Sequence, residues 1–118
     1  MPILTVTVSE GLHDEVNRNS KEIADQLLSC IRQHLAPAIG TEQVMFVPAF
    51  GAGIGCDMLA HLVHRASESR TREIRDACAH AICQLLAEKF DCSVRVRLIA
   101  TDSAAIAAAD IFKECGDE

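Results

Sequence analysis

The sequence opens MPILTVTVSEG, with Pro2 directly ahead of a run of residues typical of a β-strand. If Met1 is removed, Pro2 becomes a free secondary amine, a group that no other residue type supplies. An α-amine titrates at about 7.7–8.0 in peptides, and an apolar enclosure or a nearby arginine lowers that pKa. Pro2 is therefore a candidate for proton transfer, and the sequence leaves open whether it acts as a base or as an acid. Alternatively, it simply begins an edge strand, where its missing N–H costs little.

Six cysteines are present, but none forms a CxxC pair, so the sequence gives little support for a zinc site. Cys30, Cys78 and Cys83 fall on apolar stripes of predicted helices, where we expect small buried hydrophobic residues. His61 and His64 lie on one predicted strand but face opposite sides, so they cannot share a metal ion. We therefore expect no metal and no cofactor, and we expect the thiols to be free.

Length and composition restrict the class of protein. With 118 residues the chain is expected to form a single domain, residues 1–118. The net charge of −6 argues against a nucleic-acid partner but not against a small anionic substrate, because local arginines decide that. No secretion signal or membrane-spanning stretch is evident, so we expect a cytoplasmic protein that does not bind a membrane.

The apolar periodicity predicts two strand–helix–strand units, over residues 2–55 and 56–118. The strands are expected at Ile3–Ser9, Gln43–Pro48, Asp57–Arg65 and Ser93–Ala100. The helices are expected at about Lys21–Ala36, capped by Ser20, and at about Arg70–Lys89, capped by Ser67 or Ser69. The polar segment EGLHDEVNRNS reads as a turn, and the segment FGAGIG as a flexible glycine-rich loop near a pocket mouth.

Each predicted helix is long enough to cross over between two parallel strands, and such crossovers are almost always right-handed. Two crossovers give an α/β (α+β) fold, a four-stranded sheet with both helices on one face. The opposite face carries a mixture of apolar and polar residues and stays uncovered. Because so wide a semi-apolar face is unfavourable in water, we expect the chain to oligomerise through its sheet.

The pattern resembles the tautomerase superfamily, in particular its branch that includes macrophage migration inhibitory factor. The proline after the initiator Met and the doubled β-α-β order carry the likeness. The segment VTVSEGLHDE resembles the start of 4-oxalocrotonate tautomerase, and DMLAHLVHRASESR resembles a strand of cis-3-chloroacrylic acid dehalogenase and of malonate semialdehyde decarboxylase. The resemblance implies a homotrimer with an N-terminal catalytic proline and a small anionic substrate that carries a carbonyl or double bond beside a carboxylate.

The resemblance also implies which arginines bind that carboxylate. Arg65 matches an arginine of the dehalogenase and decarboxylase best, and Arg70 competes with Arg72 for a second match. Arg97 corresponds to a position that reaches a neighbouring subunit's pocket in the inhibitory-factor branch. On the alternative interpretation, Arg70, Arg72 and Arg75 belong to the solvated face of a helix. Arg97 then belongs to a charged sheet edge.

Departures from the family pattern restrict the chemistry. The dehalogenase uses a tyrosine and a glutamate to activate water, and this chain has no tyrosine. His34 is only a loose match to a dehalogenase histidine and reads as a surface residue. The tail DSAAIAAADIFKE reads as a short capped helix or as a strand docked on a neighbour. We therefore expect a tautomerase or isomerase. The alternatives are a decarboxylase or hydratase of the same superfamily and a non-enzymatic binding protein in which Pro2 is structural.

Overall fold

The computed structural model describes residues 1–113 and contains four strands, two long helices and two short 3-10 helices. The strands are β1 (Ile3–Val8), β2 (Gln43–Pro48), β3 (Met58–Arg65) and β4 (Val94–Thr101). The helices are α1 (His13–Leu35) and α2 (Arg72–Phe90), and the 3-10 helices are η1 (Glu10–Leu12) and η2 (Ser103–Ala105). The four predicted strands are confirmed, with bounds that shift by at most one residue.

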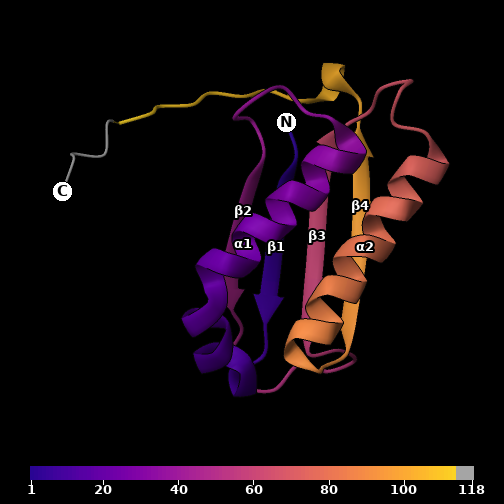
Figure 1. Cartoon of the computed structure of the whole chain (residues 1–118). Helices are drawn as coiled ribbons and strands as arrows, with labels where there is room; N and C mark the ends of the chain where they lie inside the picture. The colour runs from indigo at the N-terminus through magenta and orange to yellow at the C-terminus, as the bar shows by residue number, and fades with distance from the viewer. Residues whose placement is uncertain (114–118) are drawn as a thin grey trace.

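The strands form one mixed sheet in the order β2-β1-β3-β4. β1 pairs in parallel with β2, β3 pairs in parallel with β4, and the two pairs meet where β1 runs antiparallel to β3. Both long helices lie on one face of the sheet (Figure 1), which confirms the predicted fold class. The antiparallel join brings the start of β1 next to the end of β3.

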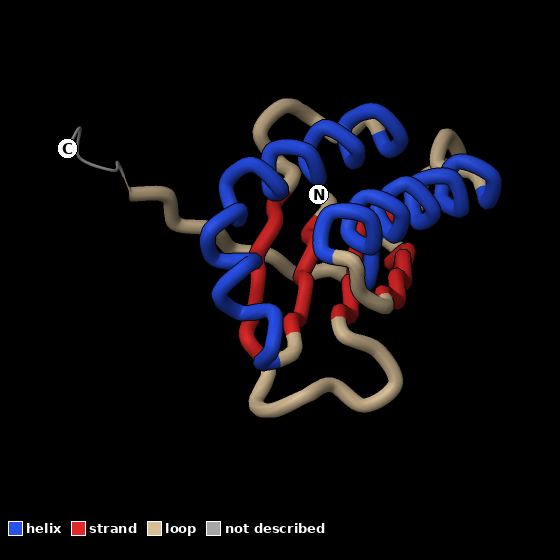
Figure 2. Tube along the Cα trace, turned by 60° about the horizontal axis from the view of Figure 1, so that its bottom comes forward, coloured by secondary structure: helices blue, strands red, loops and turns tan. Residues whose placement is uncertain are grey.

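The core lies between the sheet and the helices, as the side view of the two layers shows (Figure 2). Alternate residues of each strand point toward the helices, because strand side chains alternate between faces. In β1 these are Leu4, Val6 and Val8, which are almost completely buried. Val96 packs against the same core, as its position in the alternating pattern of β4 predicts.

The first helix begins earlier than the sequence pattern suggested, which corrects the interpretation of residues 10–20 as a turn. After one 3-10 turn, α1 starts at His13 and buries Val16 on the stripe that continues to Ile23. The polar residues of this stretch fit a helix because their side chains bond to its own carbonyls. Asn19 Nδ2 donates to the Glu15 carbonyl at 2.8 Å, and Ser20 Oγ donates to the Asn17 carbonyl at 3.2 Å.

The second helix begins later than predicted, because its N-cap is Thr71 and not Ser67 or Ser69. The Thr71 hydroxyl accepts a hydrogen bond from the Ile74 N–H at 3.3 Å. Arg70 therefore lies in the loop before the helix and not on its solvated face. This difference leaves the Arg70 side chain free to contact other elements.

The loop of residues 49–57 and the C-terminal tail also differ from what the sequence suggested. The loop of residues 49–57 lies at the end of β1 opposite Pro2, where Glu10 N–H donates to the Gly51 carbonyl at 2.9 Å. In the tail only Ser103–Ala105 forms a short helix, capped by Asp102, and residues 106–113 run away from the globule without regular structure (Figure 1). The last part of the predicted tail element lies outside the described residues. No helix within residues 1–113 has the length and apolar character needed to cross a membrane.

The sheet face turned away from the helices carries several apolar side chains in contact with water. Five of them are more than a third exposed: Ile3, Met45, Val47, Val63 and Ile99. They come from all four strands, so the apolar surface spans the width of the sheet. Arg65 and Arg97 share this face, since their positions have the same parity as Val63 and Ile99.

Candidate functional site

The N-terminus lies at the edge of the sheet where β1 begins and β3 ends. Ile3 pairs with Val63, and continuing this antiparallel register places Pro2 beside His64 and Met1 beside Arg65. The Pro2 ring is fully buried, and its carbonyl accepts a hydrogen bond from Gln43 N–H at 3.0 Å. The start of the chain is thus held between β2 and β3.

Two arginines surround the amino terminus. Burial lowers the pKa of the Met1 amino group from its usual value, and the positive charges of Arg70 and Arg65 lower it further. A neutral amine is favoured here because a protonated one would lose solvation and face two like charges. The structure therefore brings together Pro2, Arg65 and Arg70, three of the four predicted site residues.

Arg70 is fixed in place by backbone carbonyls. Its Nε donates to the Leu35 carbonyl at 3.1 Å, and its Nη1 donates to the Arg65 carbonyl at 2.9 Å. The first bond also satisfies a carbonyl at the end of α1, where a positive charge is favourable. Arg70 therefore ties the end of α1 to the end of β3, and Arg65 itself remains exposed.

Behind Pro2 lies a buried histidine whose protonation state is fixed by its partners. His64 Nδ1 lies 3.0 Å from the Arg65 carbonyl, which can only accept, so Nδ1 carries the proton. Its Nε2 lies 3.2 Å from Arg75 Nε, which can only donate, so Nε2 is the acceptor. The ring is therefore neutral, and Arg75 also holds the Leu98 carbonyl at 3.2 Å.

The environment of His64 acts against its charged form. Burial lowers the pKa of His64 most, and the nearby charges of Arg70, Arg75 and the amino terminus lower it further. The hydrogen bond to the Arg65 carbonyl acts in the opposite direction. Neither His64 nor Arg75 was a candidate site residue in the sequence, and the structure brings both close to the amino terminus. The sequence signal for His64 was its inward-facing position on β3.

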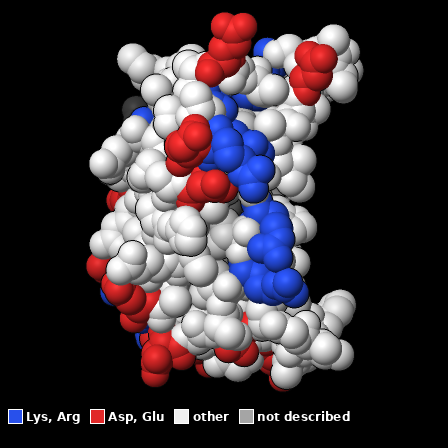
Figure 3. Space-filling view, turned by 90° about the vertical axis from the view of Figure 1, so that its right-hand side faces the viewer, with Lys and Arg blue, Asp and Glu red and all other residues white. Residues whose placement is uncertain are grey.

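Arg97 lies away from this group within one chain. It pairs with His61, whereas Arg65 pairs with Thr101 at the end of the same two strands. The separation of four residues along β4 corresponds to roughly 13 Å. Arg97 lies on the edge strand β4. Basic side chains gather in a stripe on one side of the molecule (Figure 3). Arg97 can therefore act beside Pro2 only if it belongs to a neighbouring copy.

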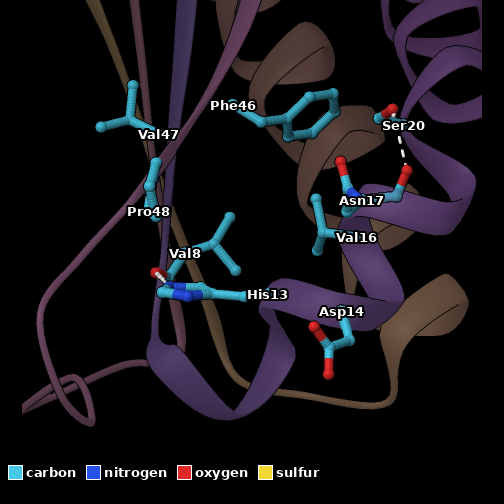
Figure 4. A pocket seen from close by; sticks show the side chains of 9 residues that line it. All are labelled: Val8, His13, Asp14, Val16, Asn17, Ser20, Phe46, Val47 and Pro48. Carbon is cyan, nitrogen blue, oxygen red and sulfur yellow. Dashed lines mark hydrogen bonds between the residues drawn. The ribbon is translucent and has the colours of Figure 1, made fainter.

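The best-defined cavity of the described chain lies elsewhere and has a different character. It has a volume of about 340 Å³ and lies at the far end of β1, between the start of α1 and the end of β2 (Figure 4). Its lining includes Asp14 and His13 but no arginine or lysine, and a ring nitrogen of His13 is bonded to the Val8 carbonyl at 2.9 Å. These residues do not favour an anion, so this cavity does not compete with the arginine-rich end.

Comparison with solved structures identifies the fold of this chain. No family model and no curated protein matches the sequence. Solved structures do match: a native fused 4-OT aligns with a TM-score of 0.75 at 16% identity, covering 90% of this chain and 91% of that one. N1, a member of the cis-3-chloroacrylic acid dehalogenase family, aligns with a TM-score of 0.73 at 17% identity over 97% of this chain and 85% of its own.

A third match, W0 fused 4-OT, is a symmetric trimer and aligns with a TM-score of 0.66 at 18% identity, covering 85% of this chain and 87% of that one. The chain has the tautomerase-superfamily fold. Macrophage migration inhibitory factor-like protein from Entamoeba histolytica and a malonate semialdehyde decarboxylase share it as well. This confirms the resemblance seen in the sequence. At identities of 13–18% the likeness establishes the fold alone.

The neutral state of His64 predicts how stability depends on pH. The pKa of His64 is lower in the folded chain than its ordinary value of 6.5, so the unfolded chain binds more protons below that pH. Stability should therefore fall as the pH drops through about 6.5. His64→Gln, which cannot titrate, should flatten this loss in urea unfolding measured between pH 7 and pH 5. His61→Gln, on the same strand but exposed, is the matched control and should leave the loss unchanged. A parallel pH dependence of His64→Gln and wild type would contradict the assignment.

Proposed function

We propose that this protein is a small enzyme in which Pro2, exposed as a secondary amine by removal of Met1, moves a proton on a small carbonyl or unsaturated acid. The observation that carries the proposal is the position of the amino terminus. It lies between Arg65 and Arg70, at a place where burial and both charges lower the pKa of an amine. A lowered pKa favours the neutral amine, and a neutral amine beside cations suits proton transfer on an anion.

The charges of the surrounding residues support an anionic substrate. The chain as a whole is acidic, with a net charge of −6, yet Arg65, Arg70 and Arg75 lie together at this end. Within residues 1–113 none of the three forms an ion pair with a carboxylate. Arg65 is exposed beside the amino terminus and can bind a carboxylate through two parallel hydrogen bonds.

The proposed step is a proton transfer between oxygen and carbon. With an enol acid, the neutral Pro2 amine removes the proton of the enol hydroxyl, and the resulting ammonium returns a proton to the adjacent carbon. The product is the keto acid, and Pro2 is regenerated as a free amine. In this step Arg65 would hold the carboxylate and so position the reacting carbon at the Pro2 nitrogen.

A trimer would complete this site. The apolar surface across the uncovered face would be buried by neighbouring sheets, as the charged and apolar mixture on that face favours. Arg97 of one copy would then reach the Pro2 end of the next, which adds a cation to the pocket. A symmetric trimer among the structures with this fold supports this arrangement.

The test of Pro2 is a comparison of processed proteins. Chain confirmed by intact mass to lack Met1 should ketonise phenylenolpyruvate faster than buffer does. Pro2→Ala keeps a terminal amine but changes its basicity and rigidity, so its rate should fall by at least about tenfold while its unfolding midpoint stays close to that of the wild type. Equal rates in the two proteins would remove Pro2 from the mechanism and favour a binding protein in which Pro2 is structural.

The role of Arg65 predicts both an affinity and a pH effect. Loss of a charge-assisted pair costs about 1.5–3 kcal/mol, so Arg65→Ala should raise KM for an acidic substrate roughly ten- to a hundred-fold. Arg65 lowers the pKa of the Met1 amine at this place, and we expect it to act in the same direction on the Pro2 amine of the processed chain. Its removal should therefore also shift the acidic limb of the kcat/KM profile to higher pH.

Arg72→Ala is the control for Arg65, since Arg72 is exposed and pairs with Asp76 on the outside of α2. Arg72→Ala should leave KM and the pH profile of kcat/KM unchanged. If Arg65→Ala raised KM as much for a neutral carbonyl analogue as for the acid, Arg65 would support the fold or the trimer, and the carboxylate contact would be excluded.

The proposed trimer predicts a mass and a sensitive position. Sedimentation at micromolar concentration should give about three times the 12.8 kDa of one chain. Ile99→Asp places a charge on the exposed apolar face, in the edge strand β4, and should shift the protein toward monomers, because the charge would be buried without a partner. His80→Asp, on the exposed side of α2, should sediment as the wild type does. A wild-type monomer would contradict the proposal.

A further inference from the structure

Two cysteines and a histidine lie together between the two long helices. Cys30 and His34 are one helical turn apart on α1, and Cys78 approaches them from α2. Their ligand atoms, two sulfurs and one imidazole nitrogen, all lie within 4.8 Å of one another. Cys30 Sγ and His34 Nδ1 are 3.7 Å apart.

The surroundings separate this cluster from ordinary buried cysteines. Cys78 is fully buried, Cys30 is 8% exposed and His34 is half-buried. A small apolar residue would fill either cysteine position, but His34 directs Nδ1 toward Cys30 instead of into water. Cys83, also on α2, has no such partner and lies 3.7 Å from the Val94 carbonyl.

The two sulfurs lie within 4.8 Å of each other. The neighbouring Cys78 thiol lowers the pKa of the Cys30 thiol, with a smaller contribution from His34. The proximity of Cys30 and burial raise the pKa of Cys78. The geometry therefore brings two thiol groups and an imidazole to one point, each from a helix whose position the core fixes.

We propose that Cys30, His34 and Cys78 form a binding site for a thiophilic metal ion, of which Zn²⁺ is the representative. Two thiolates and one imidazole are ligands that Zn²⁺ prefers, and a water molecule can occupy the fourth position. In a tetrahedral zinc site with Zn–S distances of about 2.3 Å, two sulfurs are roughly 3.8 Å apart. The ligand atoms of the present cluster, all within 4.8 Å of one another, are close to that spacing.

Binding requires a defined exchange of protons. His34 Nδ1 is 2.8 Å from the Cys30 carbonyl, which can only accept, so Nδ1 now carries the proton. Ligation through Nδ1 needs the other neutral tautomer, with the proton on Nε2. Each thiol that becomes a thiolate releases one proton as the ion binds. The metal thus replaces one hydrogen bond on α1 with a link between α1 and α2, and this link does not depend on the proposed function of Pro2.

The experiment uses the whole chain, reduced and kept free of oxygen. Zn²⁺ is titrated in competition with a chromophoric chelator, and Co²⁺ is added separately as a spectroscopic probe. We expect one ion per chain and, with Co²⁺, a thiolate-to-cobalt charge-transfer band in the near ultraviolet. His34→Ala and Cys78→Ser should each weaken Zn²⁺ binding at least about tenfold and reduce that band.

Cys83→Ser is the matched control, because it removes a half-buried cysteine of α2 that lies outside the cluster. It should bind both ions as the wild type does. If Cys78→Ser fails to fold, Cys78→Ala gives the same test, because a small apolar residue can fill this buried position. The absence of a cobalt band, or equal Zn²⁺ affinities of the wild type and His34→Ala, would overturn the proposal.

Discussion

The antiparallel pairing of β1 with β3 is the constraint on which the arrangement of this molecule depends. It joins two parallel strand pairs, each covered by its own helix, and it sets the start of one strand beside the end of another. Without this join, the amino terminus would have no contact with Arg65. The register of the pairing then decides that His64 lies beside Pro2 on the helix side, while Arg65 lies on the open face.

Positive charge collects at this end because backbone carbonyls hold it there. Arg70 and Arg75 both donate to main-chain oxygens, and Arg75 also donates to the neutral ring of His64. Carbonyl partners fix a guanidinium without neutralising it, as a carboxylate would. The end of the sheet therefore keeps its attraction for anions in a chain that is acidic overall.

The two long helices have two roles in this structure. Their apolar stripes cover the sheet, and their inner surfaces carry the cluster of Cys30, His34 and Cys78. In the last turn of α1, His34 belongs to this cluster, and the carbonyl of the next residue, Leu35, accepts a hydrogen bond from Arg70. The metal site that we propose and the arginine-rich end both involve the last turn of α1. A change in the packing of α1 would therefore alter both.

The sequence alone determined the order of the elements and the single helix layer, and it singled out Pro2, Arg65 and Arg70 as candidate site residues, because periodicity and local residue types are properties of neighbouring positions. It also contained the Cys30–His34 spacing of one helical turn. Only the tertiary structure decided that Cys78 joins that pair, that Arg75 supports His64 and that Arg97 lies apart. These are contacts between elements far apart in the chain, and their geometry follows from helix packing and strand register, which no local pattern encodes. The early start of α1 is a smaller case, since side-chain bonds to helix carbonyls allowed polar residues to continue the helix.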